Sequence, residues 1–202
     1  MSDASTSGYA EQAPAMLQRY ESASSERVHA DFLDWFPRGP SRVLDIGAGT
    51  GRDAAYFASQ GHGVLAVEPV AEMREGAQRL HPEPEVEWLD DSLPDLTTLM
   101  ARGERFELIM MSAVWMHLTV EERAEGMANV AQLMSPGARL FMTLRHGPVP
   151  EGRRMFEVTG DETIALAARN GLTSLYQARS PSVGAANIAL GVEWTKLVFE
   201  KA

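Results

Sequence analysis

The stretch from Arg42 to Asp53 constrains the fold more than any other part of the chain. A short apolar run there ends in an acid, three glycines follow at alternating positions, and a helical pattern opens at Asp53. This order predicts a β-strand, a tight turn and an α-helix. Glycine can adopt positive φ in such a turn, and it lets a ligand approach where a Cβ would collide. The first amides of the helix point back at the turn without partners, so we expect a ligand site there.

A second apolar run, Val64 to Val67, delivers Glu68 at its end, close to the ~20-residue spacing at which nucleotide-binding folds place an acid on a ribose diol. The glycines are spaced G-x-G-x-G, whereas the dinucleotide fingerprint is G-x-G-x-x-G. Asp45 stands just before them, where it would repel a pyrophosphate and attract an ammonium or sulfonium group. A ligand with an adenosine, a ribose diol, a positive centre and an amino-acid tail fits this pattern, and S-adenosylmethionine is such a ligand.

These residues, together with Val67-Glu68-Pro69, Asp90-Asp91 and the segment from Phe106 to His117, resemble the class I S-adenosylmethionine-dependent methyltransferases of the small, single-domain bacterial type. The resemblance covers most of the chain between Arg42 and Arg145. It implies an α/β fold, a three-layer sandwich around a seven-stranded, mostly parallel sheet whose last strand is antiparallel. Residues 1–40 would form an N-terminal helical cap or lid, and residues 41–202 a Rossmann-like methyltransferase domain, within one structural domain overall.

The remaining sequence fits strands that alternate with helices, which is typical of an open α/β sheet. Further strands are expected at 86–89, 106–111, 139–144, 172–177 and 192–199. The family resemblance implies that the last two have no helix between them. Ser25 is expected to cap a helix with an apolar stripe, and capping-box patterns begin at Thr119 and Thr159. Residues 1–8 are expected to be disordered or lid-like.

The composition of the chain limits the kinds of molecule that we expect it to bind. The chain has 202 residues, enough for one sizeable core, and a net charge of −10 without the basic stripe of a nucleic-acid binder. It has no cysteine, which excludes disulfides and is compatible with a reducing cytosol, and no metal site is expected. No signal peptide and no membrane-spanning apolar run is seen. We expect a cytoplasmic protein, a monomer or homodimer, that acts on a small molecule.

The resemblance assigns the cofactor residues. Asp45 and the backbone of the glycine turn would hold the methionine tail, and Glu68 would accept from both ribose hydroxyls. Asp90 or Asp91 would accept from the adenine amino group, and the sequence does not choose between them. Alone, each acid would more often be a solvated residue at a strand end. The full expected set is Asp45, Gly47, Ala48, Gly49, Gly51, Glu68, Pro69, Asp90, Asp91, Ser112 and Trp115.

The acceptor side has fewer signals. The segment from Ser112 to His117 lies where the family places the activated methyl group, and Trp115 and Met116 could pack on the cofactor or simply begin a helix in the core. The catalytic candidates are His117, His146 and Arg145, and the candidates for substrate contact are Tyr9, Tyr20 and Glu21. Glu21 is also a possible base. The alternatives are a helix cap for His117 and a solvated loop for Arg145 and His146.

The expected function is therefore transfer of a methyl group from S-adenosylmethionine to a small-molecule acceptor, with S-adenosylhomocysteine as product. Alignment and desolvation supply much of the acceleration in such a reaction. A protein or RNA methyltransferase that acts with a partner, and a non-catalytic subunit that only binds the cofactor, remain as alternatives. The glycine spacing and Asp45 disfavour an NAD-dependent oxidoreductase.

Overall fold

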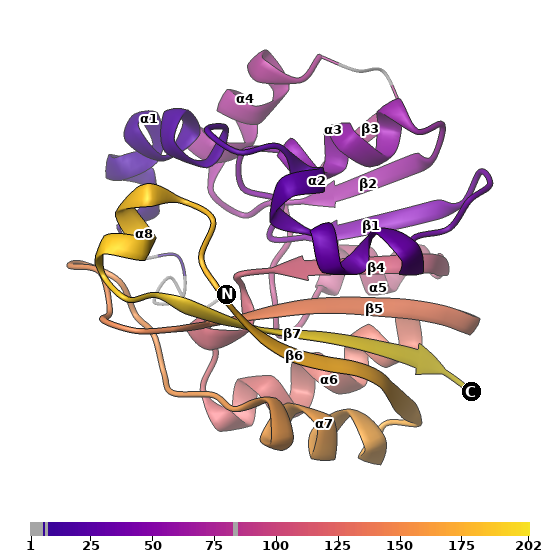
Figure 1. Ribbon diagram of the computed structural model, residues 1–202. Helices are drawn as coiled ribbons and strands as arrows, with labels where there is room; N and C mark the ends of the chain where they lie inside the picture. The colour runs from indigo at the N-terminus through magenta and orange to yellow at the C-terminus, as the bar shows by residue number, and fades with distance from the viewer. Residues whose placement is uncertain (1–5, 7, 83–84) are drawn as a thin grey trace.

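A single seven-stranded sheet forms the centre of the protein, in a computed structural model that describes residues 6, 8–82 and 85–202. The strand order is β3-β2-β1-β4-β5-β7-β6 (Figure 1). The strands are β1 Arg42–Ile46, β2 Gly63–Val67, β3 Val86–Leu89, β4 Phe106–Ser112, β5 Met134–His146, β6 Leu172–Pro181 and β7 Glu193–Lys201. The first five pair in parallel, and β7 is antiparallel to both β5 and β6. This confirms the predicted sheet.

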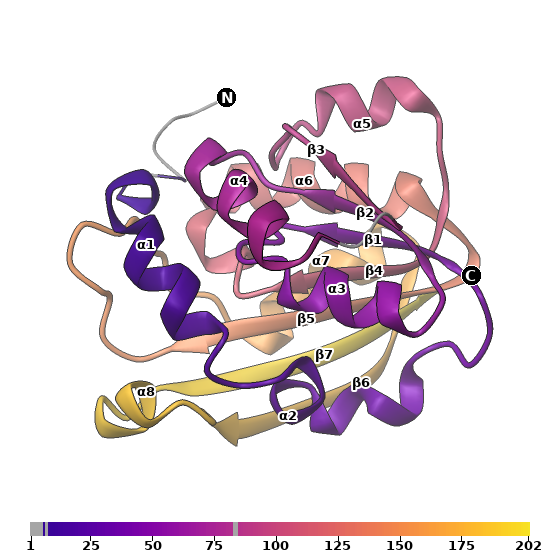
Figure 2. The same ribbon diagram turned by 90° about the horizontal axis from the view of Figure 1, so that it is seen from above.

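Helices cover both faces of the sheet, so the molecule has three layers (Figure 2). The helices are α1 Tyr9–Tyr20, α2 Ser25–Val28, the 3₁₀ helix η1 Ala30–Trp35, α3 Arg52–Ser59, α4 Ala71–Leu80, α5 Thr97–Arg102, the 3₁₀ helix η2 Trp115–His117, α6 Val120–Leu133, α7 Gly160–Arg169 and α8 Ala185–Ala189. The segment η1 and helices α3 and α4 lie on one face, and α5, α6 and α7 lie on the other (Figures 1 and 2).

The central strands are buried on both faces, as their continuous apolar runs predict. In β4, Ile109 and Met111 belong to the core under α5, α6 and α7, whereas Leu108 and Met110 belong to the core under η1 and α3. Alternate residues of a strand face opposite sides of the sheet, so each strand contributes to both cores. The two layers of helices are thereby held to one rigid platform.

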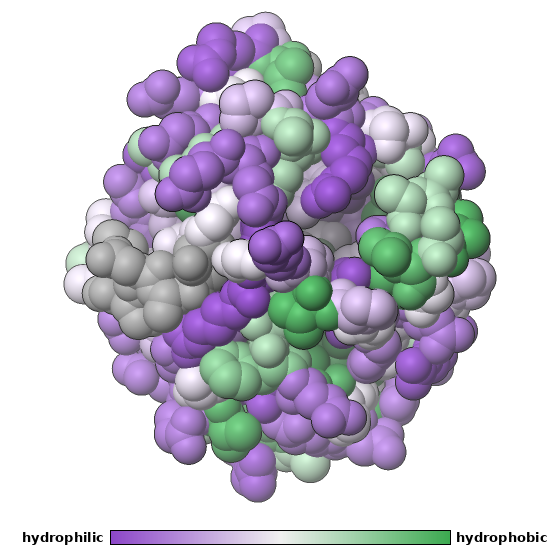
Figure 3. Space-filling view, turned by 90° about the vertical axis from the view of Figure 1, so that its left-hand side faces the viewer, coloured by the Kyte–Doolittle hydropathy of each residue, from purple (hydrophilic) through white to green (hydrophobic). Residues whose placement is uncertain are grey.

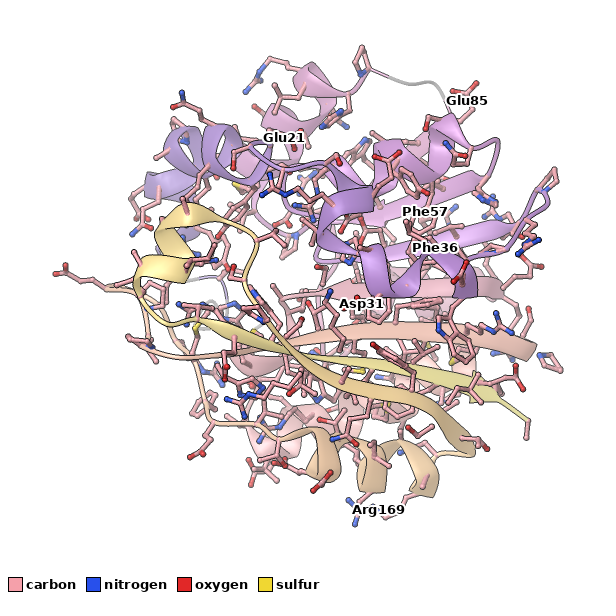
Figure 4. All side chains as sticks on the ribbon, viewed as in Figure 1. Glu21, Asp31, Phe36, Phe57, Glu85 and Arg169 are labelled. Carbon is pink, nitrogen blue, oxygen red and sulfur yellow. The ribbon has the colours of Figure 1, made fainter. Side chains whose placement is uncertain are left out.

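The N-terminal helices differ in detail from the expectation. Ser24, not Ser25, accepts a hydrogen bond from the Arg27 amide and caps α2. The expected single helix is α2 followed by η1, and its apolar stripe still packs on the sheet. Phe36, which ends η1, lies 4.9 Å from Phe57 of α3 between ring centroids (Figure 4). The expectation for residues 1–8 falls almost entirely outside the described residues.

The connection between the last two strands contains α8, where we expected no helix. The segment Ala185–Ala189 has good helix formers between Gly184 at its N-cap and Gly191 just beyond its end, a pattern that favours one short helix. The helix lies beside the carboxyl ends of the parallel strands, near α1 (Figures 1 and 2). Within the described part of the chain, no helix has both the length and the apolar character needed to cross a membrane.

Helix α1 is attached to the rest of the fold mainly through α4. Ala13 and Met16 of α1 form a small separate core with Val70 and Met73. The contact is close at Gly76, where an added Cβ would lie 2.4 Å from Cδ1 of Leu17. Glycine at this position therefore sets how near the two helices approach.

We predict that Gly76→Val loosens α1 without unfolding the sheet. The branched side chain would displace Leu17, and such overpacking costs about 1–3 kcal/mol of the free energy of unfolding. Limited proteolysis should then cut α1 faster than in the wild type, while circular dichroism stays native. Gly39→Val is the matched control, because an added Cβ there meets nothing within 4 Å. Equal cleavage rates in the two variants would contradict the proposed tight α1–α4 contact.

Candidate active site

A pocket of about 720 Å³ opens at the carboxyl ends of the parallel strands. It lies where β1 and β4 are neighbours, the point at which the strand order reverses and where open α/β sheets bind ligands. Its walls come from α1, the turn after β1, the ends of β2 and β4, the segment 148–155 and the segment 182–190. Figure 3 shows the face that holds this edge of the sheet, where hydrophilic and hydrophobic residues lie side by side.

The glycine turn forms the floor of the pocket. The amides of Gly47 and Ala48 donate to the Val67 carbonyl at 2.8 and 3.0 Å, so the turn is held against the end of β2. Gly47 and Gly49 have φ of 72° and 58°, in the left-handed region that favours glycine. A Cβ at Gly47 would also lie 2.5 Å from Cγ2 of Val114. The turn therefore requires glycine at 47 for both conformation and space.

Asp45, beside this turn, has a carboxylate oxygen without a hydrogen-bond partner. Its side chain is 2% exposed, it lines the pocket, and its Oδ2 has no hydrogen-bond partner among the described residues. Burial, with the nearby carboxylate of Asp53, raises the pKa of Asp45 well above its ordinary value. The backbone of Ala54 hydrogen-bonds the carboxylate, but a buried carboxylate oxygen without a partner is still costly. A cationic ligand group with N–H donors would relieve that cost.

Glu68 ties the turn to the next helix. One carboxylate oxygen accepts from the Gly49 amide and the other from the Val70 amide, both at 2.9 Å. Burial raises the pKa of Glu68, and the two amides act against that rise by stabilising the charged form. A carboxylate oxygen has a second lone pair, so Glu68 can accept from a ligand while it keeps these bonds.

The two neighbouring acids after β3 lie in different environments. Asp91 lines the pocket, and its oxygens accept from the amides of Ser92 and Leu99, each at 2.9 Å. Asp90 points away and forms an exposed ion pair with Arg74 at 3.1 Å. Of the two candidates for the adenine contact, Asp91 is the one that faces the pocket.

His117 and Tyr9 meet on the opposite wall. His117 Nδ1 lies 2.7 Å from the Arg154 carbonyl, which can only accept, so Nδ1 carries the hydrogen. In the neutral ring Nε2 is then the acceptor, and Tyr9 Oη donates to it at 3.1 Å. Burial lowers the pKa of His117 and raises that of Tyr9. At neutral pH His117 is therefore an uncharged base with its lone pair directed at the Tyr9 hydroxyl.

The structure brings most of the predicted site residues together. Those that line the pocket are Tyr9, Tyr20, Asp45, Gly47, Ala48, Gly49, Glu68, Pro69, Asp91, Ser112, His117 and Arg145. Their roles towards a ligand remain predictions.

Five other candidates, and Gly51 of the turn, do not line it. Trp115 is fully buried and Met116 nearly so in the core under α6, as the alternative interpretation had it. Asp90 is exposed. Glu21 pairs with His81 at 3.2 Å, and His146 Nε2 lies 2.7 Å from Thr195 Oγ1 in an adjacent cleft.

A buried ion-pair network at the start of α3 was missed. Arg52 contacts both oxygens of Asp53, at 2.9 and 3.1 Å, and donates to the Tyr20 carbonyl at 3.3 Å. His29 Nε2 lies 2.8 Å from Asp53 Oδ2. Although burial alone would raise the pKa of Asp53, His29 and Arg52 hold it well below its usual range. Arg52 and Asp53 directly follow the glycines and could have been singled out, whereas His29 has no sequence signal.

Comparison with known proteins finds similar methyltransferases. Residues 43–137 match the family model of a methyltransferase domain. A TehB-like S-adenosylmethionine-dependent methyltransferase from Corynebacterium glutamicum is 25% identical with a TM-score of 0.67, and the match covers 95% of this chain and 99% of that chain. Residues 43–137 therefore form a methyltransferase domain, and the chain has the fold of the Rossmann-like S-adenosylmethionine-dependent methyltransferases.

Two further methyltransferases are similar to this chain. The 1,6-didemethyltoxoflavin-N1-methyltransferase of Burkholderia thailandensis shares the fold, with 24% identity and a TM-score of 0.64 over 94% of this chain and 89% of that chain. An uncharacterized methyltransferase of Mycobacterium tuberculosis is 28% identical over 116 residues. That match covers 54% of this chain and 42% of the relative, so the chain matches less than half the length of that relative.

We predict opposite effects of Asp45→Asn on stability and on binding. Because the pKa of Asp45 is raised on folding, its charge costs stability above its ordinary pKa of 3.8, and the cost grows as the pH rises. The neutral amide removes that cost. Without ligand the variant should unfold at a higher temperature than the wild type at about pH 8, and the difference should vanish near pH 4. Its affinity for S-adenosylhomocysteine should fall about tenfold or more, because a charged hydrogen bond is lost.

Thermal unfolding across this pH range, with and without S-adenosylhomocysteine, measures both effects. Asp90→Asn is the control, since that carboxylate is exposed and lies outside the pocket. A variant at Asp45 that is less stable than the wild type at pH 8, or that binds equally well, would show that the buried charge has a different purpose.

Proposed function

We propose that this methyltransferase transfers the methyl group of S-adenosylmethionine to a small-molecule acceptor in the pocket at the carboxyl ends of β1, β2 and β4. The unpartnered Oδ2 of Asp45 carries the proposal, because Asp45 lines the pocket and a cationic ligand group could donate to this oxygen. The pocket volume of about 720 Å³ lies within the ~300–1,000 Å³ typical of small-molecule sites. Cofactor and acceptor share it, which leaves room for an acceptor of modest size.

The glycine turn and the acids around it fit the cofactor. Asp45 accepts from the ammonium group of its amino-acid tail, Glu68 accepts from the ribose hydroxyls, and Asp91 lies on the adenine side. The glycine turn leaves its backbone open to the ligand, since the nearest atom to a Cβ at Gly49 would be 3.9 Å away. When bound, S-adenosylmethionine supplies a methyl group on a positively charged sulfur, and the departing sulfur keeps the electron pair of the broken bond as S-adenosylhomocysteine.

The His117–Tyr9 pair takes the proton that the acceptor loses. As the acceptor's lone pair forms its bond to the methyl carbon, its proton passes to the Tyr9 oxygen, and the Tyr9 proton passes to Nε2 of His117. Tyr9 alone is a poor base, because burial raises its pKa and so keeps its hydroxyl protonated. The Nε2 lone pair of His117 already accepts from the Tyr9 hydroxyl, and its Nδ1–H is fixed by the Arg154 carbonyl. The pair thus provides a base next to the pocket without a buried charge beforehand.

A small acceptor is supported by the net charge of −10, which is unsuited to a nucleic acid. It is also supported by the Burkholderia thailandensis relative, whose structure holds 1,6-didemethyltoxoflavin together with S-adenosylhomocysteine.

We predict that His117→Asn and Tyr9→Phe lower turnover about tenfold or more, as loss of a general base does. Affinity for S-adenosylhomocysteine should stay near that of the wild type. The base must be neutral, and burial lowers its pKa below 6.5, so wild-type kcat/KM should fall only as the pH drops below that value. Formation of S-adenosylhomocysteine with a low-mass cell extract as acceptor source measures this. His146→Asn is the control; an unchanged acid limb in His117→Asn would exclude His117 as the base.

A further inference from the structure

The charges in the pocket are separated. All four carboxylates that line it, Asp45, Asp53, Glu68 and Asp91, lie on the side of β1, β2 and β3. Four guanidinium groups also line it, and one of them, Arg52, is neutralised by Asp53. The other three, Arg19, Arg145 and Arg153, come from α1, from the end of β5 and from the segment after β5. We call the half of the pocket formed by α1, the end of β5 and the segment 148–155 the acceptor half. Among the described residues, it has cationic side chains and no carboxylate.

Arg145 projects into this half without an acidic partner among the described residues. Its Nη1 donates to the Pro148 carbonyl at 2.8 Å, which leaves its other donors available. Burial lowers the pKa of Arg145, and nearby Arg19 lowers it further. A guanidinium whose charge is disfavoured in this way gains from an anion close to it.

Arg153 is similar. Its Nη2 donates to Gln12 Oε1 at 3.0 Å, and its Cζ lies 3.5 Å from the ring centroid of Tyr9. Its Nε is buried and has no hydrogen-bond partner among the described residues. The guanidinium groups of Arg153 and Arg145 both lower the pKa of His117, so both are close enough to act on the proposed base.

Arg145 and Arg153 are exceptions, because every other buried or half-buried arginine among the described residues pairs with an acid. Arg154, the next residue, pairs with Glu122 at 2.6 Å, and buried Arg123 pairs with Glu162 at 3.1 Å. Placing two guanidiniums without acidic partners around one pocket costs free energy through repulsion and desolvation. Such an arrangement is stabilised when an oxyanion accepts from both.

The same half of the pocket also has apolar surface. Val149, Met155 and Leu190 line the pocket, and Val149 and Leu190 are more than half exposed, at 54% and 57%. Figure 3 shows hydrophobic residues gathered beside hydrophilic ones on this face. Large apolar side chains exposed at a pocket mouth indicate a ligand with an apolar part.

From these observations we infer that the acceptor is a small organic oxyanion, a carboxylate or a phosphate ester, with an apolar body. Its anionic group binds between Arg145 and Arg153, and its body lies against Val149, Met155 and Leu190. This places the nucleophile beside Tyr9 and His117. The inference rests on the proposed function, since it names the class of acceptor for the same pocket.

The test is a binding screen on protein saturated with S-adenosylhomocysteine. The library consists of matched pairs with one skeleton each: aromatic and aliphatic carboxylic acids with their primary amides, and phosphate monoesters with their parent alcohols. Saturation-transfer NMR finds the binders and titration gives their affinities. We expect binders among the acids or the phosphate esters and not among their neutral partners, and the more frequent class identifies the oxyanion. Their affinity should weaken as salt is added.

The double variant Arg145→Gln, Arg153→Gln should weaken the bound anions about tenfold or more, as expected when charged hydrogen bonds are lost. Its affinity for S-adenosylhomocysteine should stay within about twofold, which also reports that it is folded. Arg169→Gln is the matched control, because Arg169 lies at the exposed end of α7, far from the pocket (Figure 4).

Three results would overturn the inference: no anion binds, acids bind no better than their amides and phosphate esters no better than their alcohols, or the double variant binds the anions as well as Arg169→Gln does. The proposed function fails separately, if the protein binds S-adenosylhomocysteine but transfers no methyl group to any low-mass acceptor. Transfer to neutral acceptors that is unchanged in the double variant would contradict the inference alone.

Discussion

The hydrogen bonds of the glycine turn hold the site together. Two amides of the turn donate to the end of β2, and a third donates to the carboxylate of Glu68. This carboxylate also accepts from the amide of Val70, the residue just before α4. Two strands and two helices are thereby joined at one point. The acids gathered there lose solvation, and the charge on Asp45 is not offset by any hydrogen bond to its Oδ2 among the described residues. Folding energy from the two apolar cores must outweigh this cost, so the fold keeps a destabilised group ready for a ligand.

The sheet and the cofactor half could be predicted because local rules determine them. An apolar run followed by glycines and an acid one strand later leaves few alternatives, and Asp45, Gly47 and Glu68 lie in the pocket as expected. The mostly parallel sheet follows from strands alternating with helices, and the antiparallel last strand was implied by the family resemblance. The sequence was less informative where a shift of one residue decides whether a side chain faces the pocket. Trp115 faces the core rather than the pocket, and Asp90 and Asp91 face opposite ways.

The acceptor half could not be predicted in the same way, because its residues come from separate segments that meet only in three dimensions. Tyr9 and His117 are 108 residues apart, and Arg153 reaches back to Gln12 across 141. No periodicity or motif connects them. His29 lies under Asp53 for the same reason, since only the packing of the N-terminal helices brings it there. Arg145 was visible in sequence because it ends a strand, and its neighbour His146, at the same strand end, lies in a different cleft.

The short helix α8 and the segment 148–155 lie outside the sheet, at the ends of β5, β6 and β7, and α1 is attached mainly through α4. None of the three supplies a strand to the sheet or a residue to the glycine turn. Substitutions, insertions and deletions in them can therefore reshape one wall of the pocket while the donor side stays intact. In evolutionary terms, these three surface segments can vary while the sheet and the glycine turn stay the same.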